Sequence, residues 1–145
     1  MNRKRLTKQL KQDEGLRLEA YQDSEDWWTI GYGRLIDTRK GGKISEDEAE
    51  YMLNNDIDNV INAVIREFPW FNDLSDVRRE VVLNMVYNLG LPRFKGFRNT
   101  ITALQRHDWT DASREMLDSL WSRQVGNRAI RLSEAMRTGQ WREEV

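Results

Sequence analysis

The feature that most constrains the fold is a long amphipathic segment that begins at Ser45. Ser45 and Glu48 form the signature of a capping box, in which the hydroxyl and the carboxylate each accept a hydrogen bond from a free backbone N–H. Apolar residues then recur at helical spacing, at Ala49, Leu53, Ile57, Val60, Ile61 and Val64. Because Pro69 cannot continue the hydrogen-bond ladder, the helix is expected to end at Phe68. The segment therefore predicts a rod about 30 Å long whose apolar stripe other parts of the chain must cover.

The residues before this helix change from helical to strand periodicity. Leu6 and Leu10 share one helical face, and Gly15 predicts that this first helix ends near Glu14. The period then changes to two along two short segments: Leu16, Leu18 and Ala20 alternate with charged residues, and Trp28, Ile30 and Tyr32 alternate with their neighbours. A third strand is expected through Leu35 and Ile36, before the turn signal of Gly41 and Gly42. We therefore expect three strands in a small antiparallel sheet.

The residues after Pro69 predict further helices. One runs from Val77 to Leu89 and ends at Gly90, and three more lie near Ile101 and Leu104, from Asp108, and before Gly139. The fold class expected is α+β, as one domain over residues 1–145. Its small lobe would span 15–45, its connecting helix 46–68, and its helical lobe 1–14 plus 69–145. The first helix is too short to be stable alone and is expected to pack on the helical lobe.

The composition limits the chemistry. The chain has no cysteine and one histidine, His107, which excludes a thiolate or histidine-cluster metal site, and no metal or cofactor is expected. Its 23 basic and 24 acidic residues nearly cancel, and the basic ends are too dilute to indicate nucleic-acid binding. No run approaches the length of a membrane span, and the basic first residues lack the apolar core of a signal peptide. We expect a soluble protein without stable membrane association, made in the cytoplasm and relying on carboxylates.

Two carboxylates near the end of the first helix suit glycoside cleavage. This reaction needs a protonated acid for the leaving oxygen and an ionised carboxylate to activate water or act as nucleophile. Glu14 would face the negative end of the helix dipole, which favours its protonated form, whereas Asp23 would lie near a turn in more solvated surroundings. The spacing of the pair leaves both inverting and retaining mechanisms open, since nine extended residues span up to about 30 Å.

The string around these carboxylates resembles a known family. Glu14, Asp23 nine residues later and Thr29 six residues beyond are followed by Ile30, Gly31 and Gly33. This pattern resembles the phage-type lysozymes of glycoside hydrolase family 24. The resemblance extends over nearly the whole chain, through Asn84-Met85-Val86-Tyr87-Asn88-Leu89-Gly90, Asn127-Arg128-Ala129 and Arg137-Thr138-Gly139-Gln140-Trp141.

The resemblance implies the roles of the site residues. Glu14 would be the general acid, Asp23 would hold or activate the attacking water, and Thr29 would help to position that water. Arg128 would pair with Glu14. The further candidates for substrate binding or support are Glu25, Asn88 and Tyr32. The implied reaction is hydrolysis of the peptidoglycan sugar backbone with inversion.

The chain departs from the family pattern at two places. Arg34 stands where the family often has histidine, and Asp56 matches the acidic partner of that histidine. We expect an Arg34–Asp56 ion pair with a structural role. The stretch from Leu35 to Ser45 is shorter than in T-even phage members, so the small lobe is expected to lack an extra helix.

The resemblance also implies a partner protein, and two other functions stay open. The family implies a monomer that acts on the cell wall after a membrane-opening partner, a holin, releases it from the host cytoplasm. A lytic transglycosylase, which needs only the acid, and a non-catalytic cell-wall binding module of the same fold are the alternatives. Among the tryptophans, Trp109, Trp121 and Trp141 are expected in the core, and Trp27 and Trp28 are candidate cleft residues.

Overall fold

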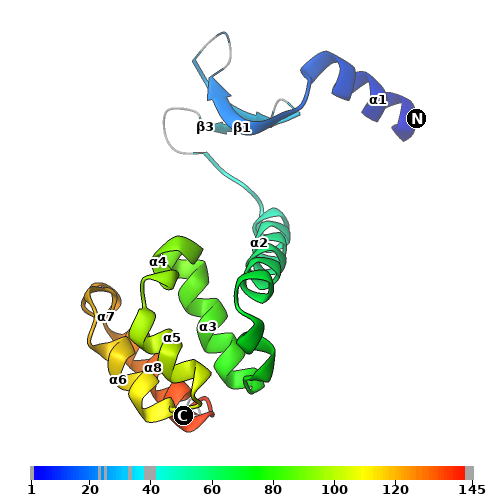
Figure 1. Cartoon of the computed structure of the whole chain (residues 1–145). Helices are drawn as coiled ribbons and strands as arrows, with labels where there is room; N and C mark the ends of the chain where they lie inside the picture. Colours follow the sequence, from blue (N-terminus) through cyan, green and yellow to red (C-terminus); the bar gives the residue numbers. More distant parts are fainter. Residues whose placement is uncertain (1, 23, 25, 33, 38–41, 143–145) are drawn as a thin grey trace. The chain divides into compact units, whose positions relative to one another are not determined.

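The structure is a computed structural model that describes residues 2–22, 24, 26–32, 34–37 and 42–142. The chain forms two compact units, Met1–Met52 and Leu53–Val145 (Figure 1). Over the described residues it is mostly helical, with one small antiparallel sheet, and the predicted α+β class is confirmed. The predicted assignment of the first helix to the helical lobe concerns how the units combine and stays a prediction.

The first unit begins with a helix and continues as a three-stranded sheet. Helix α1 (Arg3–Glu14) starts at Asn2, whose side chain accepts a hydrogen bond from the backbone N–H of Arg5. The strands β1 (Arg17–Gln22), β2 (Trp28–Gly31) and β3 (Arg34–Asp37) pair antiparallel in the order β1-β2-β3. The helix and the three strands lie where the sequence predicted them, the helix from the spacing of its leucines and the first two strands from alternation.

Little of this first unit is buried. Among the residues of this unit whose burial the structure describes, Thr29 alone is buried, at 5 % exposed, whereas Leu18 is 82 % exposed and Leu16 53 %. The alternation of apolar residues thus predicts strand geometry correctly, but it does not identify a core within this unit.

Helix α2 (Glu46–Glu67) begins in the first unit and continues into the second. The predicted capping box is present: the Ser45 N–H donates to Glu48 Oε1 at 2.9 Å, and the Glu48 N–H donates to Ser45 Oγ at 3.2 Å. Pro69 opens a short 3₁₀ helix, η1 (Pro69–Asp73), which ends the α-helical ladder as expected.

As far as it is described, to residue 142, the second unit has six α-helices after η1. They are α3 (Asp76–Leu89), α4 (Leu91–Lys95), α5 (Arg98–Gln105), α6 (Trp109–Leu117), α7 (Leu120–Val125) and α8 (Asn127–Thr138). Helix α8, orange to red in Figure 1, packs against α3, α6 and α7. The four predicted helices after Pro69 are confirmed, and α4 and α7 were not predicted.

The hydrophobic core of the described residues lies in this second unit. Its largest fully buried side chains are Phe94, Met85, Leu104, Met116, Leu132 and Met136. Phe94 packs edge-on against Phe68, with ring centroids 5.7 Å apart. Trp121 is buried as predicted, but Trp141 is 38 % exposed, so its assignment to the core was wrong. Trp141 follows the end of α8, and its indole N–H reaches the Glu80 carboxylate at 3.4 Å instead.

A partly buried arginine, Arg78, holds the end of α8. Arg78 Nε donates to the Met136 carbonyl at 2.8 Å, and its guanidinium lies 4.0 Å from the Trp109 ring centroid. The C-cap Gly139 has a φ of 75°, and an added Cβ would stand 3.0 Å from Arg78 Nη1. Burial lowers the pKa of Arg78. Glycine is therefore required here both for its left-handed backbone and for the space that Arg78 occupies.

Candidate active site

Glu14 is the last residue of α1, and its side chain is exposed. Gly15 ends the helix with a φ of 69°, and its N–H donates to the Lys11 carbonyl at 3.1 Å. Glycine adopts this backbone conformation without the steric cost that a side chain would bring. Because β1 starts at Arg17, Glu14 stands at the junction between the helix and the sheet.

The sheet register brings Thr29 close to the strand that follows Glu14. Arg17 pairs with Gly31, and Tyr21 pairs with Thr29. The buried Thr29 hydroxyl donates to the Trp27 carbonyl at 3.1 Å. This bond fixes the hydroxyl and leaves its oxygen able to accept a hydrogen bond, because a hydroxyl has one donor and two acceptor lone pairs.

Asp23 and Glu25 lie outside the described residues, so their predicted roles stay predictions. On either side of them, the Gln22 side chain donates to the Asp26 carbonyl at 3.4 Å, and Asp26 has a φ of 66°. Aspartate is among the residues that tolerate this left-handed conformation, which is common in turns.

Tyr32 links the last turn of α1 to the end of β2. The Lys11 ammonium lies 5.4 Å from the centroid of the Tyr32 ring, which is 44 % exposed. A cation over an aromatic face at this distance is attracted by the ring quadrupole. The structure therefore places Glu14, Thr29 and Tyr32 in one unit, with the helix that carries Glu14 in contact with the end of the strand that carries Thr29.

Arg34 pairs with Glu48, a partner that sequence reasoning missed. Its Nη2 donates to Glu48 Oε1 at 2.9 Å, and its Nη1 contacts Oε2, which makes the pair bidentate. The bonds from Arg34, followed by those from the Ser45 backbone and hydroxyl, lower the pKa of Glu48 to about 2. The same contacts raise the pKa of Arg34. The predicted Arg34–Asp56 pair joins residues of different units and stays a prediction.

Arg34→Ala is expected to lower the melting temperature while leaving cleavage by the folded enzyme nearly unchanged. The pKa of Glu48 falls from 4.5 to about 2 on folding, so the stability it contributes is present above pH 4.5. That stability is lost as the pH falls toward 2. Thermal melts of wild type and Arg34→Ala from pH 7 to pH 2 should therefore converge at the acid end. A difference in melting temperature that persists undiminished at pH 2 contradicts this account, and a selective loss of cleavage gives Arg34 a catalytic role.

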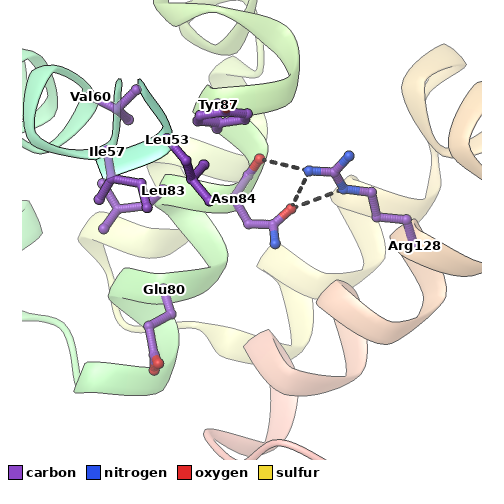
Figure 2. Close-up of a pocket in the computed structure, with 8 residues that line it drawn as sticks. All are labelled: Leu53, Ile57, Val60, Glu80, Leu83, Asn84, Tyr87 and Arg128. Atoms are coloured by element: carbon purple, nitrogen blue, oxygen red, sulfur yellow. Dashed lines mark hydrogen bonds between the residues drawn. The ribbon is translucent and has the colours of Figure 1, made fainter. Parts of the chain in front are cut away.

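In the second unit, Arg128 is held by Asn84. Figure 2 shows the Arg128 side chain, from the start of α8, directed at Asn84 on α3. Arg128 Nε and Nη2 donate to Asn84 Oδ1 at 2.9 and 2.7 Å, and Nη2 also lies 3.5 Å from the Asn84 carbonyl oxygen. Two donors on one amide oxygen fix the plane of the guanidinium. Asn84 is thus the partner of the candidate residue Arg128. The sequence did not identify it, because nothing in its spacing from Arg128 indicates the contact.

Arg128 and Asn84 lie at the polar edge of a hollow of about 290 Å³. Its lining residues are Leu53, Ile57, Val60, Glu80, Leu83, Asn84, Tyr87 and Arg128 (Figure 2). The α2 side of the hollow is apolar, and the α3 side carries both apolar and polar groups. A hollow of this kind is suited to a ligand or a chain segment that has one apolar and one polar face.

Asn88 lies one helical turn beyond Asn84. Its Oδ1 accepts a hydrogen bond at 2.8 Å from the indole N–H of the buried Trp121. This bond orients the exposed Asn88 amide, whose NH₂ group carries two further hydrogen-bond donors. Asn88 and Arg128 belong to the second unit, so the predicted pairing of Arg128 with Glu14 and the predicted role of Asn88 in substrate binding stay predictions.

No group of three or more His, Cys, Asp or Glu side chains arranged to hold a metal ion occurs among residues 2–22, 24, 26–32, 34–37 and 42–142. Within that part of the chain, no helix combines the length and apolar character needed to cross a membrane.

The fold defines the class of the protein, and comparison with known families gives the family. A helical chain with a three-stranded antiparallel sheet is the α+β architecture of the T4-lysozyme-like fold. The family model of phage lysozyme matches residues 11–137, and the chain belongs to the phage lysozyme family.

Proteins from several organisms are similar to this chain in sequence. "Probable T4-type lysozyme 1" of Dictyostelium discoideum is 27% identical over 157 residues, covering 90% of this chain and 92% of the relative. An endolysin of Acyrthosiphon pisum secondary endosymbiont phage 1 is 32% identical over 120 residues, covering 79% and 75%. The pre-baseplate central spike protein Gp5 of Enterobacteria phage T4 is 28% identical in an alignment that covers 92% of this chain and 28% of that protein.

Proposed function

We propose that the chain is a muramidase, which hydrolyses the β-1,4 bond between N-acetylmuramic acid and N-acetylglucosamine in bacterial peptidoglycan. The observation that carries the proposal is the position of Glu14, an exposed carboxyl at the junction of α1 and β1. Thr29 lies in the same unit at the family spacing. Membership of the phage lysozyme family supports a cell-wall hydrolase, and the specific bond is our inference.

In the proposed reaction Glu14 donates its proton to the glycosidic oxygen while the bond from that oxygen to the anomeric carbon breaks. A water molecule attacks the anomeric carbon from the opposite face and loses a proton to Asp23. The Thr29 oxygen accepts a hydrogen bond from this water, which holds it in line. Glu14 ends ionised and Asp23 protonated, and proton exchange with solvent restores both.

Attack from the opposite face inverts the anomeric centre. Inverting enzymes hold their two carboxyl groups about 6.5–9.5 Å apart, which leaves room for the water. Proton NMR of the first product formed should therefore show the α anomer, and retained β anomer in fresh product contradicts inversion. Borohydride reduction of the same digest should give muramitol at the new ends, whereas glucosaminitol contradicts the assigned bond.

Asn84 is proposed as a positioning residue that acts through Arg128. The two hydrogen bonds from Arg128 to the Asn84 amide oxygen support this role. We expect Asn84→Ala to lower kcat by roughly ten- to a hundredfold, since small misplacements of a positioned group have costs of this order. Asn84→Asp keeps an acceptor oxygen and should recover part of the rate.

The readouts for Asn84 are initial rates on sacculi together with thermal melts. A purely structural role predicts equal losses of stability in both variants with normal kcat for the folded fraction. That result contradicts a positioning role.

We further propose that the enzyme acts as an endolysin monomer in host-cell lysis. Two of the relatives found are named endolysin, one of them at 32% identity. On this proposal the protein starts in the host cytoplasm, and a holin opens the inner membrane to release it to the wall. Expression in bacteria with and without a co-expressed holin tests this dependence, and lysis at equal rates in both strains contradicts it.

A further inference from the structure

One side of α1 carries a row of basic side chains that the proposed reaction does not use. Lys4, Lys8 and Lys11 are all exposed and follow one another at helical spacing. At about 100° per residue they fall within an arc of roughly 60°. Leu6 and Leu10 lie about 150° away around the same helix. The lysines therefore form a separate stripe that the apolar residues of the helix do not explain.

This lysine stripe (Lys4, Lys8 and Lys11) is unfavourable for the helix taken alone. The first turn of α1 contains Arg3, Lys4 and Arg5 and no acidic residue, although the positive end of a helix dipole favours anions. Like charges one turn apart also repel. Among the ion pairs formed by described residues, none involves α1. Within the described part of the first unit no acidic side chain compensates these charges, so the stripe is available to an anionic partner.

The position of the stripe connects it to the proposed active site. Lys11 precedes Glu14 by three residues and lies over the Tyr32 ring. Lys8 is about 9 Å from Glu14 along the helix axis, at 1.5 Å per residue. An anionic group bound to the stripe thus lies one to three helical turns from the candidate acid.

The residue types of α1 and the net charge of the chain indicate which class of anionic polymer the stripe can bind. A helix that lies on a lipid surface presents a face of large apolar and aromatic residues, whereas α1 has Leu6 and Leu10 and no aromatic residue. Nucleic-acid-binding domains are strongly basic, whereas this chain has a net charge of -1. A polymer that is mostly uncharged and carries spaced carboxylates needs only a local basic stripe.

We propose that the lysine stripe binds the carboxylates of the peptide stems of peptidoglycan and so seats the glycan strand beside Glu14. This inference rests on the proposed function, whose substrate it specifies further. Because the stripe does not touch the reacting bond, it should lower KM and leave kcat unchanged. Its effect should also weaken with salt, because exposed charges are screened.

The test uses the full-length protein and two forms of one substrate. The substrates are purified sacculi free of secondary polymers, with their stem carboxylates either intact or converted to methylamides. The test variant is Lys4→Glu/Lys8→Glu, which leaves the Lys11–Tyr32 contact in place. The matched control, Arg93→Glu/Arg106→Glu, changes the net charge equally at exposed positions of the second unit.

At about 10 mM salt, where the Debye length is about 30 Å, the test variant should raise KM roughly tenfold on intact sacculi at unchanged kcat. The control should shift KM much less. On methylamidated sacculi wild type and test variant should have similar KM values, and near 1 M salt the difference on intact sacculi should vanish. A second variant, Lys4→Gln/Lys8→Gln, removes the two charges without reversing them and should raise KM by an intermediate amount. Because glutamine is a good helix former, this variant should fold even if the charge-reversed variant does not.

Three results overturn the proposal. Equal KM shifts in test and control variants assign the effect to net charge. An undiminished effect on methylamidated sacculi excludes the carboxylates as ligands. Wild-type binding to anionic vesicles or duplex DNA that is tighter than to intact sacculi, and lost in the test variant, assigns the stripe to another polyanion. Failure of the proposed function is distinct, because wild type then releases no fragments from either form of sacculi.

Discussion

Replacing Glu14 by glutamine is expected to lower the rate of sacculus cleavage by roughly a hundred- to ten-thousandfold, the range that general acid catalysis contributes. The amide has nearly the same shape as the carboxyl but cannot donate an acidic proton to the leaving oxygen. Glu14 is exposed at the end of α1, so the change should leave the fold intact. Release of reducing ends at equal protein concentration measures the loss, and thermal melts establish that the variant is folded.

Glu19→Gln is the matched control for this experiment. Glu19 is an exposed carboxylate on β1 of the same unit, with no proposed role in the reaction. Its replacement makes the same change of charge and should alter the rate less than about twofold. A Glu14→Gln enzyme that retains the rate of Glu19→Gln removes Glu14 as the acid.

Phe94→Ala is expected to destabilise the protein by about 3–5 kcal/mol, the usual cost of truncating a buried aromatic residue. Phe94 is 0% exposed. It contacts the Phe68 ring edge-on at 5.7 Å and stacks on Phe97 at 6.2 Å, so it joins α4 to the end of α2 and the start of α5. Both aromatic contacts are lost with the side chain, and the cavity left behind adds to the cost. Urea unfolding at 25 °C measures the change.

Leu120→Ala is the control for the core prediction. Leu120 is a large apolar residue of the same unit but is 61% exposed, so its truncation should cost less than about 1 kcal/mol. Similar losses in the two variants contradict the assignment of Phe94 to the centre of the core.

The features predicted best from the sequence are those that depend on residues close together in the chain. The Ser45–Glu48 capping box and the end of α2 before Pro69 are confirmed, because a cap or a proline acts within one helical turn. The pairing of Glu48 with Arg34 was missed. It depends on how β3 folds back toward the start of α2, which no local pattern encodes.

The two short helices α4 and α7 could not be predicted from local sequence patterns either. Helices α4 and α7 have five and six residues, too few for a periodic pattern to be recognised. Tertiary packing supports them instead, since each contributes one buried aromatic residue, Phe94 and Trp121 respectively.

The site was predicted in part. Glu14 and Thr29 are identifiable because the family pattern fixes their spacing within one continuous string. The bonds from Arg128 to Asn84 and from Trp121 to Asn88 join residues 44 and 33 positions apart. Such contacts follow from helix packing, so the sequence supplies the candidate residues but not the partners that orient them.

The most direct test of the proposed glycosidase activity is the mass of the muropeptides that wild type, Glu14→Gln and Asp23→Asn release from purified sacculi. Wild type should release fragments whose new muramic acid ends have gained one water, and both variants should release far less of the same products. Anhydro-muramic acid ends in the wild-type digest would identify a lytic transglycosylase. Binding to sacculi with no fragments released would identify a non-catalytic module, and either result would contradict hydrolysis by Glu14 and Asp23.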